Sequence, residues 1–178
     1  MEGRLPQSYR LLMKPIINLD ALTLHEDPDD GTRYGGGGYG VISDEIGAKK
    51  LGYNLSIVPP GRRGCPFHSH RNQEEMFFIL SGTGVLRFGD TEHSLRPNDV
   101  IACPPGGPEV AHQIINTGTE DLRYLAVSTK EPVEIVEYPD SGKVGCFVGD
   151  YGKMALRKLF RAEGSVPYMD REPAGLEE

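Results

Sequence analysis

The sequence predicts an all-β protein whose short strands close into a sandwich or a barrel. From residue 51 onward, short apolar runs alternate with turn signals about every 8 to 12 residues, the spacing of such folds. The 23 glycines and 14 prolines are spread along the chain and form no single tract, which indicates many turns. No long helical period interrupts the runs, so parallel βαβ units are not expected.

Each predicted strand is an apolar or β-branched run that ends at a cluster of Gly, Pro, Asn, Asp or Ser. The runs cover residues 51–58, 75–80, 85–88, 93–96, 100–103, 111–116 and 122–129. We therefore take residues 51–130 as the barrel. Residues 1–50 are interpreted as an N-terminal extension that packs on the barrel, and residues 131–178 as a C-terminal extension.

The two extensions give weaker patterns. In the first, "KPIINLDAL" predicts a short strand or a turn of helix, and "HEDPDDGTRYGGGGYG" predicts a loop. The glycines of that loop fit G-x-G-x-x-G, but a dinucleotide site needs a strand before them and a helix after them, so a flexible loop is expected. In the second, residues 133–152 predict one strand and then an ordered loop, and "KMALRKLF" predicts a short strand or a helix.

The composition argues against several classes of partner. The formal net charge of −7 repels phosphate backbones and anionic lipid, so neither nucleic acid nor a membrane is an expected partner. No apolar run approaches the roughly 18 residues that a spanning helix needs. The three cysteines, Cys65, Cys103 and Cys146, are odd in number and far apart, which favours reduced thiols and a cytoplasmic protein.

Ligand-type side chains are concentrated in "FHSHRNQEEMFF", residues 67–78. His68 and His70 are two positions apart, so in an extended segment both imidazoles point to one face. Glu74 and Glu75 are neighbours and point to opposite faces, so only one of them can join the histidines. The run that follows is apolar on both faces, so its periodicity does not choose between the two glutamates.

A third histidine, His112, begins a later strand after the turn "PPGGPE". Three imidazoles and one carboxylate match borderline divalent ions such as Mn, Fe, Ni, Cu or Zn. An isolated His-x-His is common on protein surfaces, but the nearby glutamate and the later histidine favour a metal site. Arg62, Arg63 and Arg71 flank the pair; they could bind a carboxylate or phosphate, or form an exposed cluster.

These residues resemble the two motifs of the cupin family. The first motif is matched by His68, His70, Glu75 and Gly82, and its six-residue gap before the glycine favours Glu75 over Glu74. The second motif is matched by Pro104, Gly106, His112 and Asn116. The resemblance covers residues 51–130, and the flanks are similar to poorly characterised small single-domain cupins, some named as sugar-phosphate isomerases.

The match departs from the motifs at three positions. Arg62 stands where the first motif begins with glycine, and Asn98 stands at the first glycine of the second motif. Asparagine is a tolerable replacement because it also adopts positive φ in turns. Five residues, where the motif has two, separate Gly106 from His112, and this longer loop could keep His112 in place or shift it.

The resemblance implies a double-stranded β-helix, a jelly-roll barrel that holds a divalent transition metal (Zn, Mn, Fe or Ni) through His68, His70, Glu75 and His112. It favours a metal-dependent enzyme acting on a small polar or anionic metabolite, of the sugar-phosphate isomerase or epimerase type. A metal-dependent dioxygenase and a non-catalytic metabolite-binding or sensor cupin are the alternatives. No catalytic acid or base can be named. We also expect a homodimer, because the outward-facing Met76, Phe78 and Leu80 need cover.

Overall fold

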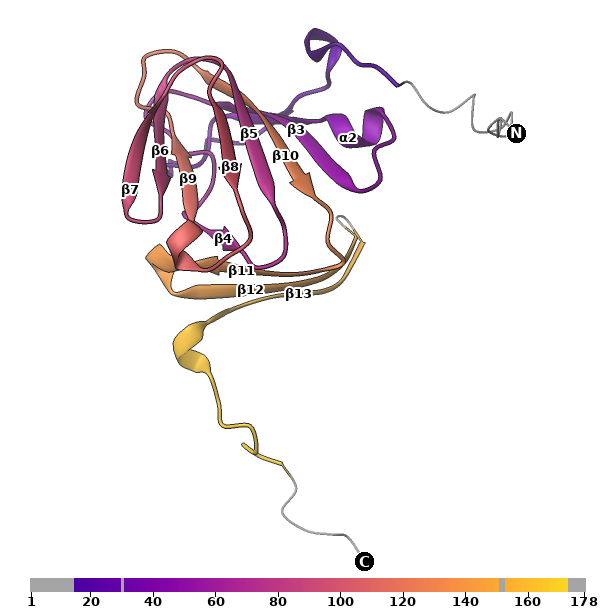
Figure 1. The fold of residues 1–178 in the computed structure, drawn as a ribbon, viewed down its shortest axis with the longest axis vertical. Coiled ribbons are helices and arrows are strands. Elements are labelled where there is room, and N and C mark those ends of the chain that lie inside the picture. The colour runs from indigo at the N-terminus through magenta and orange to yellow at the C-terminus, as the bar shows by residue number, and fades with distance from the viewer. Residues whose placement is uncertain (1–14, 30, 151–152, 173–178) are drawn as a thin grey trace, which may run out of the picture.

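The protein is described by a computed structural model that covers residues 15–29, 31–150 and 153–172 (Figure 1). Every strand predicted between residues 51 and 130 is present. They are β3 (Leu51–Val58), β5 (Glu75–Ser81), β6 (Gly84–Phe88), β7 (Thr91–Leu95), β8 (Val100–Cys103), β9 (His112–Ile115) and β10 (Leu122–Thr129). A two-residue strand, β4 (Ser69–His70), is added to these.

The strands form two opposed antiparallel sheets, as in a double-stranded β-helix. One sheet has the order β1-β2-β3-β10-β5-β8, and a second has the order β7-β6-β9. An isolated bridge between His68 and His112 connects β9 to β4, and β4 begins a further sheet with the order β4-β11-β12-β13. The second side of the barrel therefore continues past β4 into the C-terminal strands.

The main hydrophobic core lies between the two sheets. Its members come from alternate positions of the predicted strands, as expected when one face of each strand is buried. Ile79 and Leu122 are completely buried, and Phe77, Leu86, Ile101, Ile114 and Tyr124 pack around them. Cys103 belongs to this core as a small buried side chain. The prediction of an all-β barrel is confirmed.

The N-terminal extension contains more regular structure than the sequence predicted. It forms η1 (Leu19–Ala21), β1 (His25–Glu26), β2 (Gly38–Val41) and α2 (Ile42–Glu45). The predicted loop is therefore wrong in part, since β2 pairs with β3 and β1 pairs with β2. The reason lies at Gly40, where an added Cβ would lie 2.3 Å from the Leu22 side chain. This glycine serves close packing, not flexibility.

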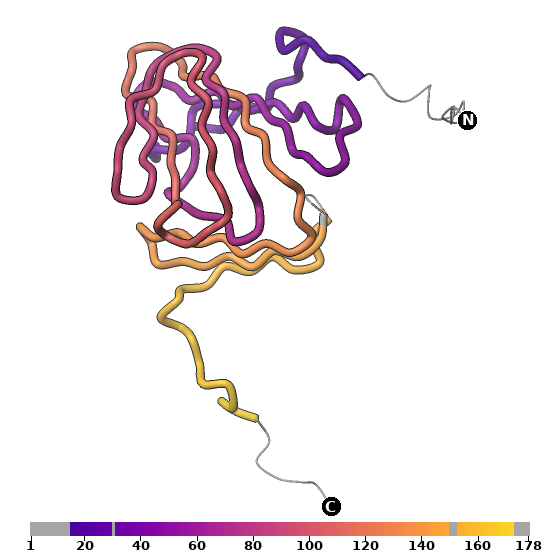
Figure 2. Tube along the Cα trace, viewed as in Figure 1, coloured from indigo at the N-terminus to yellow at the C-terminus, as the bar shows by residue number. Residues whose placement is uncertain are grey.

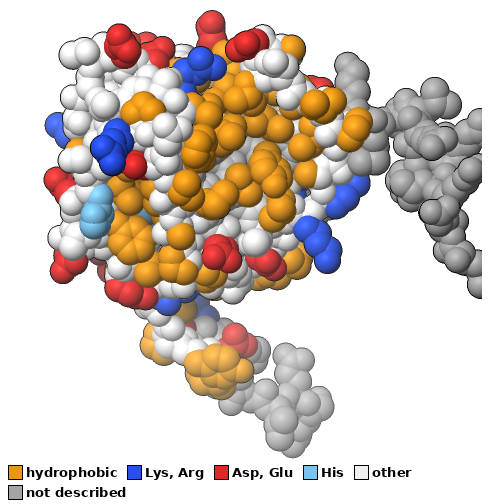
Figure 3. Space-filling view, turned by 45° about the horizontal axis from the view of Figure 1, so that its top comes forward, with side chains coloured by type: hydrophobic (Ala, Val, Ile, Leu, Met, Phe, Trp, Pro, Cys, Tyr) orange, Lys and Arg blue, Asp and Glu red, His pale blue; other side chains and the backbone are white. Residues whose placement is uncertain are grey.

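A satellite core joins this extension to the outer surface of the barrel. Leu22, Ile42 and Leu55 are buried together, and Leu80 is among the partly buried residues packed against them. The extension thus covers part of the outward face of β5. Met76, farther along the same face, remains 42% exposed, and Val100 on the neighbouring β8 is 62% exposed. Figure 3 shows hydrophobic side chains gathered across one broad face of the molecule.

The C-terminal extension also differs from the prediction. It forms β11 (Val133–Tyr138), η3 (Pro139–Ser141), β12 (Lys143–Asp150), β13 (Lys153–Arg161) and η4 (Ala162–Gly164). The predicted ordered loop is wrong, because β12 is a strand paired along the whole of β11. These strands run across the lower end of the barrel in Figure 1, and Figure 2 shows the following residues leading away from the body.

Within the described ranges, no helix has both the length and the apolar character needed to cross a lipid bilayer. The boundaries proposed at residues 50 and 130 stay a prediction. Both extensions are hydrogen-bonded to barrel strands, β2 to β3 and β11 to β4.

Candidate metal centre

The histidine pair is positioned by two neighbouring strands. His70 ends β4, and His68 stands beside His112 at the start of β9. The His112 N–H donates to the His68 carbonyl at 2.8 Å, and the His68 N–H donates to the His112 carbonyl at 3.2 Å. This reciprocal pair fixes the two backbones side by side, so residues far apart in the sequence present their imidazoles at one place.

The carboxylate comes from the first residue of β5. Glu75 shares its face with Phe77 and Ile79, which are buried, whereas Met76 faces the other way and is exposed. The structure therefore places Glu75, and not Glu74, beside the histidines. The glycine that follows the strand, Gly82, has φ 81°, and an added Cβ would lie 2.5 Å from the Asp121 carbonyl oxygen. Only glycine fits this turn.

Three imidazole nitrogens converge on one oxygen atom. From Glu75 Oε2 the distances are 2.9 Å to His112 Nε2, 3.4 Å to His70 Nε2 and 3.9 Å to His68 Nε2. Ligand atoms of His68, His70 and Glu75 lie within 4.8 Å of one another, and His112 joins this group through its contact with Glu75. The structure thus brings all four residues of the predicted site together.

The other ring nitrogens are turned away onto acceptors. His68 Nδ1 lies 2.8 Å from the Pro66 carbonyl, and His112 Nδ1 lies 3.3 Å from the Val110 carbonyl. A carbonyl accepts only from an N–H, which assigns the proton to Nδ1 and leaves Nε2 with a free lone pair in the neutral ring. The lone pair of His112 Nε2 would repel the Glu75 carboxylate oxygen, 2.9 Å away, unless a proton or a cation lies between them. The donor set therefore fits a divalent metal ion.

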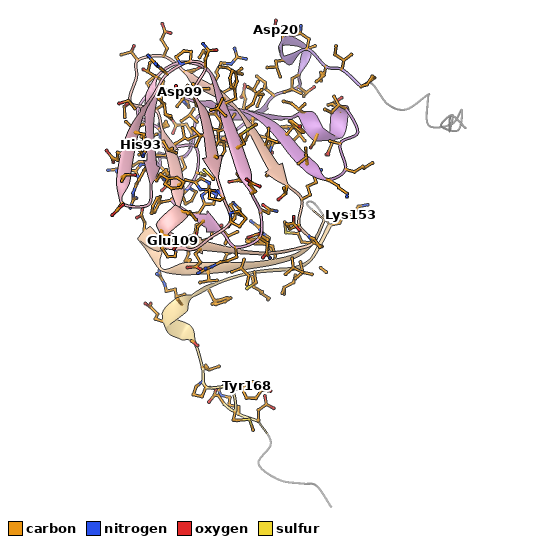
Figure 4. The ribbon with its side chains drawn as sticks, viewed as in Figure 1. Asp20, His93, Asp99, Glu109, Lys153 and Tyr168 are labelled. Carbon is orange, nitrogen blue, oxygen red and sulfur yellow. The ribbon has the colours of Figure 1, made fainter. Side chains whose placement is uncertain are left out.

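The loop before His112 explains why its longer spacing does no harm. The additional residues form the short helix η2 (Pro108–Val110), and the Gly106 N–H donates to the His70 carbonyl at 2.8 Å. His112 is only 3% exposed. Asn98, which replaces the glycine of the second motif, has φ 75°, as its turn position requires. In Figure 4, Glu109 marks this loop at the lower end of the barrel, while His93 lies apart on β7.

The C-terminal extension supplies a carboxylate that sequence reasoning missed. Glu134 on β11 is 4% exposed, and its Oε1 lies 3.7 Å from His70 Nδ1. That distance exceeds a hydrogen bond, so the contact is electrostatic. Glu134 is itself held by the backbone N–H groups of residues 71, 72 and 73, at 2.8, 3.3 and 2.8 Å. It is thus fixed on the side of His70 that faces away from Glu75.

Burial and mutual contacts set the charges of these groups. Burial lowers the pKa of His68 to about 4, and the neighbouring His112 and His70 add to the effect. Burial acts to lower the pKa of His70 as well, but Glu134 and Glu75 outweigh it and raise that pKa to about 9. Burial disfavours the charged form of Glu75, yet its contacts with His112 and His70 hold its pKa well below the usual range. At neutral pH His68 is therefore ready to bind a cation, whereas His70 must first lose a proton.

Other side chains complete the surroundings. The Tyr138 ring is stacked on His68, with centroids 6.2 Å apart and planes at 25°, and Phe77 lies 5.7 Å from the ring of His112. The Cys65 sulfur lies 3.6 Å from His68 Nδ1, and burial, with smaller contributions from Glu75 and Cys103, raises the pKa of this thiol to about 12. Cys65 therefore stays protonated at neutral pH.

The arginines that flank the histidine pair are mostly committed to neighbours. Arg62 pairs with Asp29 at 2.9 Å, and Arg71 forms an ion pair with Glu137. Arg63 donates to the buried Gln113 side chain at 3.2 Å. Two of the three are thus neutralised by carboxylates, which favours a structural role for them over anion binding.

Comparison with known proteins agrees with this geometry. Residues 54–128 match the family described as "Cupin domain". A crystal structure described as a sugar phosphate isomerase from a cupin superfamily, from Silicibacter pomeroyi, superposes with a TM-score of 0.71 at 27% identity. The match covers 88% of this chain and 98% of that one.

Two curated relatives carry other names. Auxin-binding protein 1 of Arabidopsis thaliana is 33% identical over 103 residues, covering 53% of this chain and 50% of the relative. An oxalate-binding protein of Thermotoga maritima is 34% identical over 70 residues, covering 39% of this chain and 54% of the relative. The chain spans about half the length of these relatives.

The fold and the cluster together define a β-barrel with a histidine–carboxylate site at one end. Residues 54–128 are a cupin domain, and the fold around them is that of the cupin superfamily.

Proposed function

We propose that His68, His70, Glu75 and His112 bind one divalent transition-metal ion, with Zn, Mn, Fe and Ni as the candidates. The convergence of three Nε2 atoms on Glu75 Oε2 carries this proposal. Without a cation, these nitrogen–oxygen contacts are favourable only if protons lie between the atoms, and a bound metal ion would take the place of those protons. Imidazole and carboxylate together suit ions of borderline softness.

Glu134 acts in this proposal as a positioning residue. A carboxylate behind a metal-binding histidine fixes the ring orientation and makes the ligand more basic. Glu134 meets this description, because three backbone N–H groups hold it 3.7 Å from His70 Nδ1. The C-terminal extension would then help to build the metal centre.

We further propose a metal-dependent enzyme acting on a small polar or anionic metabolite, of the isomerase or epimerase type. The similarity to a structure described as a sugar phosphate isomerase, over 88% of this chain, supports this reaction class. When bound, the ion supplies Lewis-acid stabilisation of negative charge that develops on a substrate oxygen. The protein's own contribution is to hold the four ligands and to cover one side of the site with Tyr138.

A metabolite-binding protein without catalysis is the second candidate, and one observation favours it. Cys65, Tyr138 and Glu134 lie beside the ligands, and the pKa of each is shifted away from neutrality, where a general base works best. Burial raises the pKa of Cys65 to about 12 and also raises that of Tyr138. The pKa of Glu134 is lowered: burial opposes ionisation, but His70 and the backbone amides outweigh it.

A homodimer and a cytoplasmic location belong to the same proposal. The exposure of Met76 and Val100 supports a second copy on that face of the barrel, and the N-terminal extension already covers Leu80. All three cysteines are free, which supports a reducing compartment.

Elemental analysis of the purified chain tests the metal proposal. We expect about one ion per chain, as the four-ligand site predicts. The ion should be lost in His70→Ala and Glu75→Ala and kept in Glu74→Ala, the adjacent control. Circular dichroism should show that all three variants stay folded. Full metal occupancy in Glu75→Ala would remove this carboxylate from the site.

A substrate screen then separates the functions. Sugar phosphates are assayed for isomerisation with each metal, and catechol-like compounds and keto acids are assayed for oxygen consumption with iron. Turnover of a sugar phosphate supports the isomerase, and oxygen uptake supports the dioxygenase alternative. Saturable binding of a metabolite that is never converted would favour the non-catalytic protein.

A further inference from the structure

One face of the C-terminal sheet continues the face on which the histidine cluster lies. Residues paired directly across antiparallel strands point their side chains to the same side. His70 pairs with Val136 on β11, and Val136 pairs with Gly145 on β12. Tyr138, two positions beyond Val136, shares this face and stacks on His68. The face therefore extends from the cluster across β11 to β12 and β13.

This face carries positive charge in a chain whose net charge is −7. Lys143 pairs with Tyr138, and its ammonium lies 5.4 Å from the centroid of the Tyr138 ring. Arg157 pairs with Phe147, the partner of Glu134, and so lies on the same side. Its charge also reaches Tyr138, where it opposes the larger effect of burial, which raises the pKa of that phenol.

Neither cation is neutralised by a carboxylate. Among the residues that the structure describes, Lys143 and Arg157 form no ion pair, whereas Arg62 and Arg71 pair with Asp29 and Glu137. The arginines nearest to the histidines in the sequence are thus occupied. The cations on the cluster's face without a carboxylate partner come from the C-terminal strands. They include Arg161, which pairs with Lys143 but donates to the Ser141 carbonyl at 3.0 Å, and this leaves Lys143 and Arg157 for a ligand.

We propose that Lys143 and Arg157 bind the anionic group, a phosphate or a carboxylate, of a small metabolite whose other end reaches the histidine cluster. Lys143 on β12 is two strand spacings from β4, about 10 Å, and Arg157 on β13 is three spacings away, about 14 Å. This span suits an extended phosphorylated or dicarboxylic metabolite. A guanidinium and an ammonium are the side chains that form charge-assisted hydrogen bonds with such groups. The inference rests on the proposed function, because it takes the cluster as the reaction or binding centre.

Titration of the full-length chain with inorganic phosphate, followed by NMR, tests this site directly. In the protein as purified and again after chelation of metal, we expect saturable amide shifts in β11, β12 and β13. Lys143→Gln and Arg157→Gln should each weaken phosphate binding about tenfold, the loss of one charge-assisted hydrogen bond. The control is Lys158→Gln, which removes the same charge from β13 but lies next to Arg157 on the opposite face, and it should leave the affinity unchanged. Acetate as a second probe distinguishes a carboxylate site from a phosphate site.

Two outcomes would overturn the inference. If phosphate binding weakened equally in all three variants, the effect would come from general surface charge and not from a specific site. If the amide shifts were confined to residues outside the C-terminal sheet, the anion would bind elsewhere. Metal content is measured on the same samples. A chain that binds phosphate through Lys143 but holds no metal contradicts the proposed function alone, and a chain that holds metal but binds phosphate equally in every variant contradicts this inference alone.

Discussion

The two extensions of the barrel differ in what they contribute. The N-terminal one covers the outer surface with apolar side chains, since Leu22 and Ile42 are buried against Leu55. The C-terminal one is hydrogen-bonded to β4, the strand that carries His70, and brings Glu134 and Tyr138 to the histidine cluster. One extension thus contributes buried area, and the other contributes polar groups at the site.

This difference follows from where each extension joins the barrel. The strand β2 pairs with β3, whose outward face is apolar and needs cover. The strand β11 pairs with β4 at the histidines, so every second residue of β11 faces the site. We therefore expect substitutions in the N-terminal extension to change stability, and substitutions on the inner face of β11 to change metal affinity.

The largest expected effect is on stability. Leu22→Ala should lower the free energy of unfolding by about 2–4 kcal/mol, because it removes a buried side chain from the satellite core. Leu22 is 8% exposed, and Leu24, at 45%, is the control, whose change to Ala should cost under about 0.5 kcal/mol. Denaturant unfolding measures both. A Leu22→Ala protein of normal stability but weakened metal binding would contradict the view that the N-terminal extension contributes stability and not metal affinity.

A smaller effect is expected from Glu134→Gln. Loss of the charge behind His70 should weaken metal binding about 10- to 100-fold, the usual cost of removing such a partner. Competition with a chromophoric chelator gives the affinity without any assay of activity. Glu137→Gln is the control: it lies on the same strand but loses only a partly exposed ion pair with Arg71, worth about 0–1 kcal/mol. Equal losses of metal affinity in the two variants would mean that β11 supports the site only by packing on β4, and not through the charge of Glu134.

The smallest effect concerns pH. The pKa of His70 is raised to about 9, so in the metal-free protein its contribution to stability is full below the ordinary value of 6.5 and is lost as pH rises through about 9. Metal must displace this proton, so affinity should increase about tenfold per pH unit between 7 and 9 and then level off. Calorimetry in buffers of different ionisation enthalpy should show at least one proton released per ion at pH 7. In Glu134→Gln the metal affinity should level off at a lower pH, because the pKa of His70 is no longer raised by this carboxylate. An unchanged pH dependence would mean that Glu134 does not influence the protonation of His70.

Much of the barrel could be predicted from sequence because its strands are short, periodic and bounded by glycine or proline. The strand β12 was not predicted. Gly145 and Gly149 interrupt its apolar pattern, yet Gly145 is a buried residue in the middle of a paired strand. The strand β2 was missed because its sequence lies in the glycine-rich run "GGGGYG", although Gly40 there allows β2 to pack closely against Leu22.

The candidate site divides in the same way. Local spacing was enough to predict His68 and His70, but it left Glu74 and Glu75 open. The resemblance to the cupin motifs selected Glu75 and supported His112, which had been noted at the head of a later strand. Glu134 could not be distinguished from Glu131 and Glu137, because only the docking of β11 on β4 decides which of them faces His70. The one sequence feature that pointed to Glu134 was an acidic residue between apolar residues in "VEIVEY".

Anomalous diffraction from crystals grown with one equivalent of metal tests the central claim most directly. We predict a single peak at bonding distance from Nε2 of His68, His70 and His112 and from a carboxylate oxygen of Glu75, with the hydrogen bond between Glu75 and His112 replaced. A peak elsewhere, or an intact Glu75–His112 contact with no peak beside it, would contradict the account.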